Sequence, residues 1–177
     1  MVLFDVRMFL IQTYAIHDDL FYDSMINNVK SNWEITSGTT VSSDSTGTTF
    51  SYNGSTRYIK LPVTQSSFCM EWDFITGTGN DGFGVETWRG DTWISYGNYH
   101  NGQYTITGTS GNGKSSSFLT DVHCKLVVNS NGHSLYVNDE LIGTVTPKSA
   151  SGTFYIGFYL SSAITSQKIK NVEIKPL

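Results

Sequence analysis

Short runs of aromatic and β-branched residues alternate with Gly, Asn and Ser turns through the second half of the chain, and this pattern constrains the fold most. The runs 123–128 (HCKLVV), 134–137 (SLYV) and 141–145 (LIGTV) have the composition of consecutive β-strands. The turn 129–132 (NSNG) separates the first two runs, and Asn-Gly supplies the positive φ angles that a tight hairpin requires. The sequence therefore predicts antiparallel hairpins.

The composition agrees with a single all-β domain. The chain has 177 residues, of which 14% are aromatic and 15% charged, with 17 Gly and 3 Pro; this balance favours sheet and turns over helix. The net charge is −4 and no Lys/Arg cluster is present, so we expect no nucleic-acid partner. No apolar run approaches the roughly 20 residues that span a bilayer, so we expect no membrane span.

Further segments have strand character, which brings the expected total to about 11 to 13 strands. Segment 39–48 is poor in apolar residues and is expected to be a loop with marginal strand, whereas 50–52 and 57–63 are expected to form a hairpin. Strands with one apolar face need a second sheet to cover them. The predicted fold is a two-sheet antiparallel jelly-roll β-sandwich. The other expected strands are 33–36, 68–75, 83–88, 92–96, 103–107, 153–160 and 168–175.

The first 16 residues (MVLFDVRMFLIQTYAI) are apolar but contain Asp5 and Arg7. They lack a basic start and a small-residue cleavage site, so we do not interpret them as a signal peptide. We expect residues 1–16 to form an extended arm or edge strand and residues 17–177 to form the sandwich domain. An alternative is that the arm joins copies of the chain, or the chain and a larger assembly, because an apolar segment requires cover.

Alternation along the strands separates the two cysteines. In segment 68–75 (FCMEWDFI) the aromatic residues, including Trp72, share the expected core face, which places Cys69 on the outward face. Cys124 shares a face with the apolar residues of 123–128. The sequence therefore predicts that the two cysteines do not form a disulfide.

Three segments resemble the concanavalin-A-like lectin/glucanase and laminin-G-like superfamily. They are 123–145 (HCKLVVNSNGHSLYVNDELIGTV), 169–174 (IKNVEI), and an acidic-aromatic start at 18–21 (DDLF) followed by 33–35 (WEI) and Gly38. The resemblance covers about residues 17 to 177 and implies a concanavalin-A-like sandwich. Members of the superfamily include sugar-binding modules, adhesion domains, phage tail and fibre domains, and glycoside hydrolases.

The resemblance also raises the possibility of an enzyme. Laminarinase-like members carry a strand motif Glu-x-Asp followed by a third acid, and Glu71 and Asp73 match its first two positions. The third position falls at Ile75 or Thr76, which cannot donate a proton. Glu86 would replace that acid only if its strand paired with the strand of Glu71. We expect instead that these acids lie on a solvated sheet face, partnered by Lys125 or Arg89, and that the protein is not an enzyme.

Aromatic side chains at outward positions favour binding. Alternation places Trp88, Tyr155, Tyr159 and Tyr136 outward, and such rings stack on the C–H faces of sugars or serve protein interfaces. The alternative is that another segment covers them. Loops on a rigid sandwich carry recognition residues, and the densest aromatic-polar cluster is our predicted ligand site. Its members are Trp88, Arg89, Asp91, Trp93, Tyr96, Tyr99, His100, Asn101 and Tyr104.

We expect no cofactor and no metal centre. Asn80-Asp81 and Asp18-Asp19 can supply oxygens to Ca²⁺, which needs 6–8 of them, but no calcium-loop motif is present. The predicted function is a non-catalytic glycan-recognition module, extracellular, on a cell surface or in a virion tail or fibre. The alternatives are a glycoside hydrolase that uses Glu71 and Asp73, and a structural virion or fibre domain that docks through residues 1–16.

Overall fold

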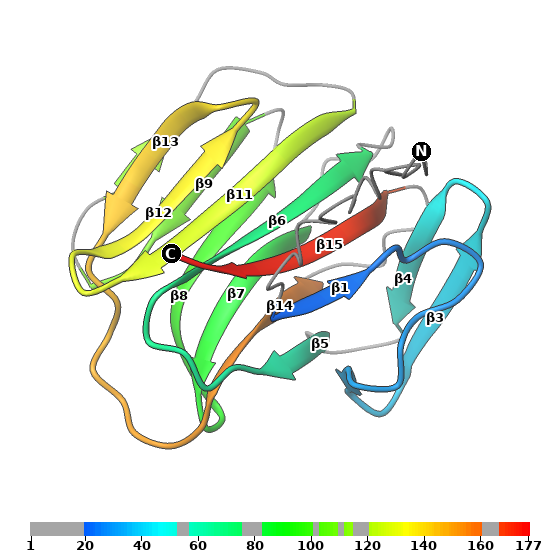
Figure 1. Cartoon of the computed structure of the whole chain (residues 1–177), viewed down its shortest axis with the longest axis horizontal. Coiled ribbons are helices and arrows are strands. Elements are labelled where there is room, and N and C mark those ends of the chain that lie inside the picture. Colours follow the sequence, from blue (N-terminus) through cyan, green and yellow to red (C-terminus); the bar gives the residue numbers. More distant parts are fainter. Residues whose placement is uncertain are drawn as a thin grey trace, which may run out of the picture.

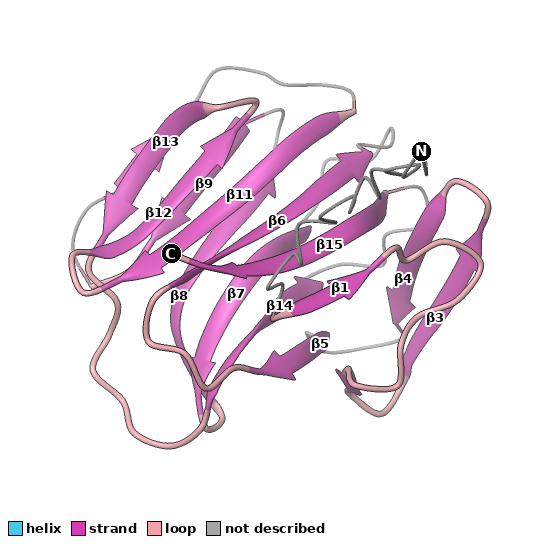
Figure 2. Ribbon diagram, in the orientation of Figure 1, coloured by secondary structure: helices cyan, strands magenta, loops and turns pink. Residues whose placement is uncertain are grey.

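A computed structural model describes residues 20–52, 57–75, 83–100, 103–109, 112–114, 121–160 and 167–177. All regular structure in these ranges is β-strand (Figure 2). The predicted arm, residues 1–16, lies outside the described residues, as do Asp18-Asp19, Asn80-Asp81 and Asn101. The prediction of an all-β fold is confirmed.

The strands form two antiparallel sheets that pack face to face (Figure 1). The first sheet has the order β13-β12-β11-β6-β15-β4-β3, and β1 also pairs with β15. Its strands are β13 (Glu140–Val145), β12 (Gly132–Val137), β11 (Val122–Asn129), β6 (Phe68–Ile75), β15 (Lys168–Pro176), β4 (Gly47–Tyr52), β3 (Thr39–Asp44) and β1 (Phe21–Asp23).

The second sheet has the order β10-β9-β8-β7-β14-β5-β2. Its strands are β10 (Asn112–Lys114), β9 (Gln103–Thr107), β8 (Thr92–His100), β7 (Phe83–Arg89), β14 (Phe154–Leu160), β5 (Arg57–Pro62) and β2 (Glu34–Ile35). The chain crosses between the sheets repeatedly, so strands that are consecutive in sequence often belong to different layers.

The core lies between the sheets and is made by the alternate, inward side chains of both. Phe68 meets Phe154 at 5.7 Å between ring centroids, and Trp72 meets Phe158 at 5.6 Å, both edge to face. Such aromatic pairs add about 0.5–1.5 kcal/mol each beyond the area they bury. Trp72 is therefore a core residue, as the alternation predicted.

Both cysteines are free, which confirms the prediction that they form no disulfide. Cys124 points into the core. Cys69 lies on the face of Glu71, with Sγ 4.0 Å from a carboxylate oxygen, but it is only 6% exposed.

Turn residues account for the predicted hairpins of the second half. Gly132 has a φ of +129° at the β11–β12 turn, and Asn138 and Asp139 have φ values of +47° and +65° at the β12–β13 turn. Asn and Asp tolerate this left-handed conformation better than other side chains. The sequence signal and the turns agree.

Two expectations about the first half are wrong. Segment 39–48 is not a loop: β3 and β4 form a hairpin with six registered residue pairs, which Gly47 permits with a φ of +140°. Segments 50–52 and 57–63 do not pair with each other, because β4 belongs to the first sheet and β5 to the second.

Among the described residues, no helix has the length and apolar character needed to cross a membrane.

Candidate functional site

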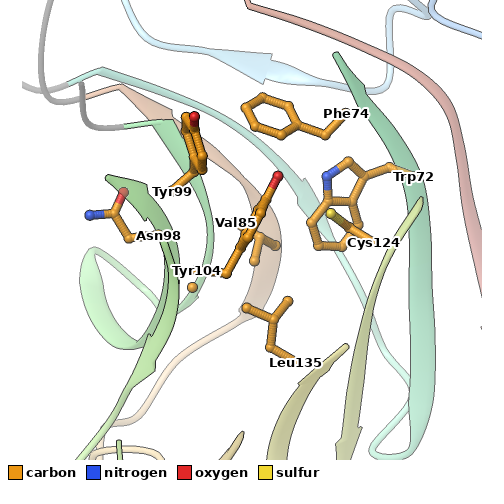
Figure 3. Close-up of a pocket in the computed structure, with 9 residues that line it drawn as sticks. Trp72, Phe74, Val85, Asn98, Tyr99, Tyr104, Cys124 and Leu135 are labelled. Carbon is orange, nitrogen blue, oxygen red and sulfur yellow. The ribbon is translucent and has the colours of Figure 1, made fainter. Parts of the chain in front are cut away.

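The residues of the predicted ligand site do not lie together in the structure; those that it describes lie in three separate places. Tyr99 and Tyr104 lie in the core, 5% and 3% exposed, and Figure 3 shows them pointing between the sheets towards Phe74 and Trp72. Their ring centroids are 5.2 Å apart, and that of Tyr99 is 5.7 Å from Phe74. They line a cavity of about 20 Å³. Their assignment to a surface site is wrong, because β8 runs on to His100 and its alternation points Tyr99 inward.

Arg89 and Asp91 flank the β7–β8 turn and point in different directions. Asp91 is exposed and its carboxylate lies 3.5 Å from the ammonium of Lys60. The Arg89 guanidinium lies 4.9 Å from the ring centroid of Phe154, at one end of the sandwich. The side chain of His100 and residue Asn101 lie outside what the structure describes.

The remaining predicted residues, Trp88, Trp93 and Tyr96, lie on the outward surface of the second sheet. Alternation in the neighbouring strands brings Tyr58, Tyr155 and Tyr159 to the same surface. We call this set the aromatic face; it consists of Tyr58, Trp88, Trp93, Tyr96, Tyr155 and Tyr159. The prediction that Trp88, Tyr155 and Tyr159 point outward is confirmed. Trp88 and Tyr159 are nonetheless only 4% and 9% exposed, so the accessible rings are those of their partly buried neighbours.

The register of the strands explains why aromatic side chains of this face cover one another and leave little of Trp88 and Tyr159 exposed. Trp88 of β7 contacts Tyr58 of β5 at 5.4 Å between centroids, although β14 lies between their strands. The contact crosses β14 at Gly157, which has no side chain. A Cβ at Gly157 would lie 2.0 Å from the backbone oxygen of Ile59. Similarly, Tyr96 of β8 meets Tyr159 of β14 at 6.0 Å across Gly84 of β7. The glycines therefore permit the rings to tilt across the sheet.

Glu86 occupies the centre of the aromatic face. It lies opposite Tyr96 on β8 and Gly157 on β14. Burial raises the pKa of its carboxyl to about 8, and the positive charge of Lys148 opposes that shift only in part. The carboxyl is therefore mostly protonated at pH 7 and can donate a hydrogen bond. Burial also raises the pKa of Tyr159, with Glu86 and Tyr96 contributing.

Two lysine side chains also lie on this face, where their ammonium groups contact aromatic rings. Lys60 is 5% exposed, and its ammonium lies 4.2 Å from the ring centroid of Tyr155 and 4.9 Å from that of Tyr58. The ammonium of Lys148 lies over the ring of Trp93. Cation–π contacts of this kind contribute about 0.5–2 kcal/mol each. The face thus combines rings, a neutral acid and two cations.

Glu71 and Asp73 lie on the outward surface of the first sheet, on the other side of the molecule. Glu71 is within 3.8 Å of Lys125 and 3.4 Å of Lys175. Asp73 is 3.0 Å from Nδ1 of His123 and accepts a 2.7 Å hydrogen bond from the amide of Asn171. The expected partnership with Lys125 is confirmed, whereas the expected alternative, Arg89, belongs to the second sheet.

Glu86 cannot act with Glu71, because the pairing of their strands that this would require does not occur. β6 belongs to the first sheet and β7 to the second. Packed sheets are about 10 Å apart, and these two side chains point away from each other. Their separation therefore exceeds the 5–9.5 Å between the carboxyl groups of glycosidases.

In the described part of the chain, no three His, Cys, Asp or Glu side chains gather closely enough to hold a metal ion. The pairs named above for Ca²⁺, Asp18-Asp19 and Asn80-Asp81, lie outside that part.

Comparison with solved structures shows what the architecture resembles. The carbohydrate binding module CBM66 from Bacillus subtilis matches with a TM-score of 0.60 at 17% identity, over 81% of this chain and 95% of that one. A Bacillus subtilis protein of unknown function with a galectin-like fold matches with a TM-score of 0.63 at 12% identity, over 89% and 96%. The chain therefore has a galectin-like β-sandwich fold, consistent with the resemblance noted in the sequence. No protein-family model and no curated protein sequence matches the chain.

A similar sandwich also occurs as part of a larger protein among the matches. Trypanosoma rangeli sialidase in complex with 2,3-difluoro-KDN matches with a TM-score of 0.58 at 12% identity, over 88% of this chain but 30% of the sialidase. The TM-scores establish a common fold, and the resemblance noted in the sequence is confirmed at that level.

Proposed function

We propose that this protein is a non-catalytic glycan-binding module whose ligand lies on the aromatic face. The observation that carries the proposal is the arrangement of Trp93 and Tyr96 around a protonated Glu86. Sugar rings present C–H surfaces that stack on aromatic rings, and their hydroxyls accept hydrogen bonds from a neutral carboxyl. The galectin-like and CBM66 neighbours supply a precedent in fold.

The charged groups support binding rather than hydrolysis. Glycosidases use two carboxyl groups that flank the scissile bond, one of them able to donate a proton. Glu71 and Asp73 are engaged by basic and amide partners on the first sheet, and Glu86 lies on the opposite surface. This arrangement does not assemble the required pair from the three acids.

The biological setting we propose is an extracellular surface or a virion tail or fibre, where glycan-binding sandwiches act as adhesins. In that setting residues 1–16 would dock onto a second copy or a larger assembly. Deleting residues 1–16 tests this part: light scattering should report a smaller particle than for the full chain, and an unchanged mass would reject docking between copies.

A glycan array followed by calorimetric titration of the best ligand tests the main proposal. Tyr96→Ala removes an accessible ring and should weaken binding at least tenfold. Tyr136→Ala is the matched control, because Tyr136 is a partly buried tyrosine on the outward surface of the first sheet, where Lys125 lies 5.7 Å from its ring centroid. Equal affinities of both variants and the wild type would reject the aromatic face, and an array without any bound glycan would reject the function.

A further inference from the structure

A second cavity lies at one end of the sandwich, beside the Trp93 end of the aromatic face. It has a volume of about 440 Å³, within the range of small-molecule sites. Three loops that connect strands surround it, and they lie together at the lower left of Figure 1. They are residues 63–67 between β5 and β6, the β11–β12 turn, and residues 147–153 between β13 and β14. We call this cavity the end pocket.

The end pocket has an apolar floor and a neutral polar rim. Ile94, Val128 and Phe154 form the floor. The rim carries hydroxyl and amide groups from Gln65, Ser66, Ser67, Asn129, Ser130 and Ser149. A surface that combines C–H contacts with many neutral donors and acceptors suits a polyhydroxylated ligand.

Arg89 supplies the charge of the pocket. Its guanidinium lies over Phe154 and donates one hydrogen bond, 3.4 Å long, to the carbonyl of Gly152, which leaves further N–H donors for a ligand. Lys148 also lines the pocket, but its ammonium lies over Trp93 on the aromatic face. No Asp or Glu is among the described residues that line this cavity. Among the described residues this guanidinium has no carboxylate partner, and it therefore suits an anionic group, which Arg binds in a bidentate manner.

His133 completes the inner wall. Its Nδ1 is 2.6 Å from the hydroxyl of Ser95 and 3.4 Å from that of Thr87. Within the described residues its Nε2 has no hydrogen-bond partner, so this atom is available to the pocket. Burial, with a contribution from Arg89, lowers the pKa of His133 to about 4, so the ring is neutral near pH 7 and its Ser95 contact orients it.

We propose that the end pocket binds an acidic monosaccharide, a hexuronate or similar hydroxylated carboxylate, with the carboxylate on Arg89 and the sugar hydroxyls on His133 and the serine rim. The site borders the aromatic face at Lys148 but uses other binding groups and does not depend on the function proposed there. The outcomes for the two surfaces are therefore independent.

Titration with D-glucuronate and D-glucose, followed by NMR, tests this site. Glucuronate should shift the ring resonances of His133 and the backbone amides of 129–131, and glucose should bind at least tenfold more weakly. Arg89→Gln should weaken glucuronate binding at least tenfold. Lys170→Gln, a cation on the outward surface of the first sheet, and Tyr96→Ala should leave it unchanged.

Several results would overturn the proposal. They are equal affinities for glucuronate and glucose, unchanged glucuronate affinity in Arg89→Gln, glucuronate shifts confined to the aromatic face, and no binding of glucuronate at tens of millimolar. The comparison of the two sugars uses the wild-type protein, so it decides the question even if Arg89→Gln proves unstable in thermal denaturation.

Discussion

Replacing Glu86 with Gln is expected to stabilise the fold at pH 7 and to leave its stability unchanged at pH 4. Burial raises the pKa of Glu86 from its ordinary value of 4.5 to about 8. The folded protein therefore holds a proton that the unfolded chain releases above pH 4.5. The associated stability is fully present below pH 4.5 and is lost as the pH rises towards 8. Gln has nearly the shape of the protonated acid and has no proton to lose.

The expected magnitude follows from the size of the pKa shift. Each pH unit between the two pKa values costs about 1.4 kcal/mol. From pH 4.5 to pH 7 the free energy of unfolding of the wild type therefore falls by about 3 kcal/mol relative to Glu86→Gln. This figure is an upper value, because the carboxyl retains some contact with solvent. It is a large fraction of the 5–15 kcal/mol that stabilises a typical domain.

Urea denaturation at pH 4, 5, 6, 7 and 8, followed by tryptophan fluorescence, measures the difference. The wild type and Glu86→Gln should agree at pH 4 and diverge progressively above pH 4.5, with equal m-values. Glu140→Gln, at an exposed position on β13, is the control and should show no such divergence. A difference that does not change with pH would refute the reasoning, as would a less stable Glu86→Gln at pH 7.

Three further predictions test buried groups. The pKa of His133 is lowered from 6.5 to about 4, so acidification across that window should cost up to about 3 kcal/mol relative to His133→Gln, measured by urea denaturation. Asp23 accepts three hydrogen bonds from residues 25–33; Asp23→Ala should lower stability by about 3 kcal/mol, and a loss within about 0.5 kcal/mol would contradict this. Gly157→Ala places a Cβ 2.0 Å from the oxygen of Ile59 and should markedly lower the melting temperature.

Two-residue periodicity predicted the core wherever a strand could be recognised from its own composition. In β6 and β11 it correctly placed Trp72 and Cys124 inward and Glu71 outward. It was not extended to Tyr99, because the Gly and Asn residues after Tyr96 resemble a turn, and it was not applied to Tyr104, although alternation with Ile106 in the expected strand 103–107 indicates an inward side chain. β8 continues past Tyr96 since it pairs with β7 on one side and β9 on the other, and pairing partners cannot be read from one strand's sequence.

Sheet membership was the other property that the sequence did not reveal. β6 and β7 are consecutive, and consecutive strands are neighbours in about two-thirds of cases. Here they lie in different sheets, which separates Glu86 from Glu71 and excludes Glu86 as the third acid beside Glu71 and Asp73. Composition identifies each strand well. Whether two consecutive strands pair in one sheet or lie in different sheets depends on contacts between segments that are distant in the sequence.

The two outward surfaces differ in how their buried acidic groups are compensated, and this difference supports the proposal of a ligand site on the second sheet. On the first sheet, Glu71 is compensated by Lys125 and Lys175. On the second, burial forces Glu86 towards its neutral form, and the charge of Lys148 compensates it only in part. Features that lower stability without serving the core are characteristic of functional sites. They become understandable if a ligand hydroxyl accepts a hydrogen bond from the protonated carboxyl of Glu86, in which case affinity for the glycan should fall as the pH rises through 8 and should not fall in Glu86→Gln.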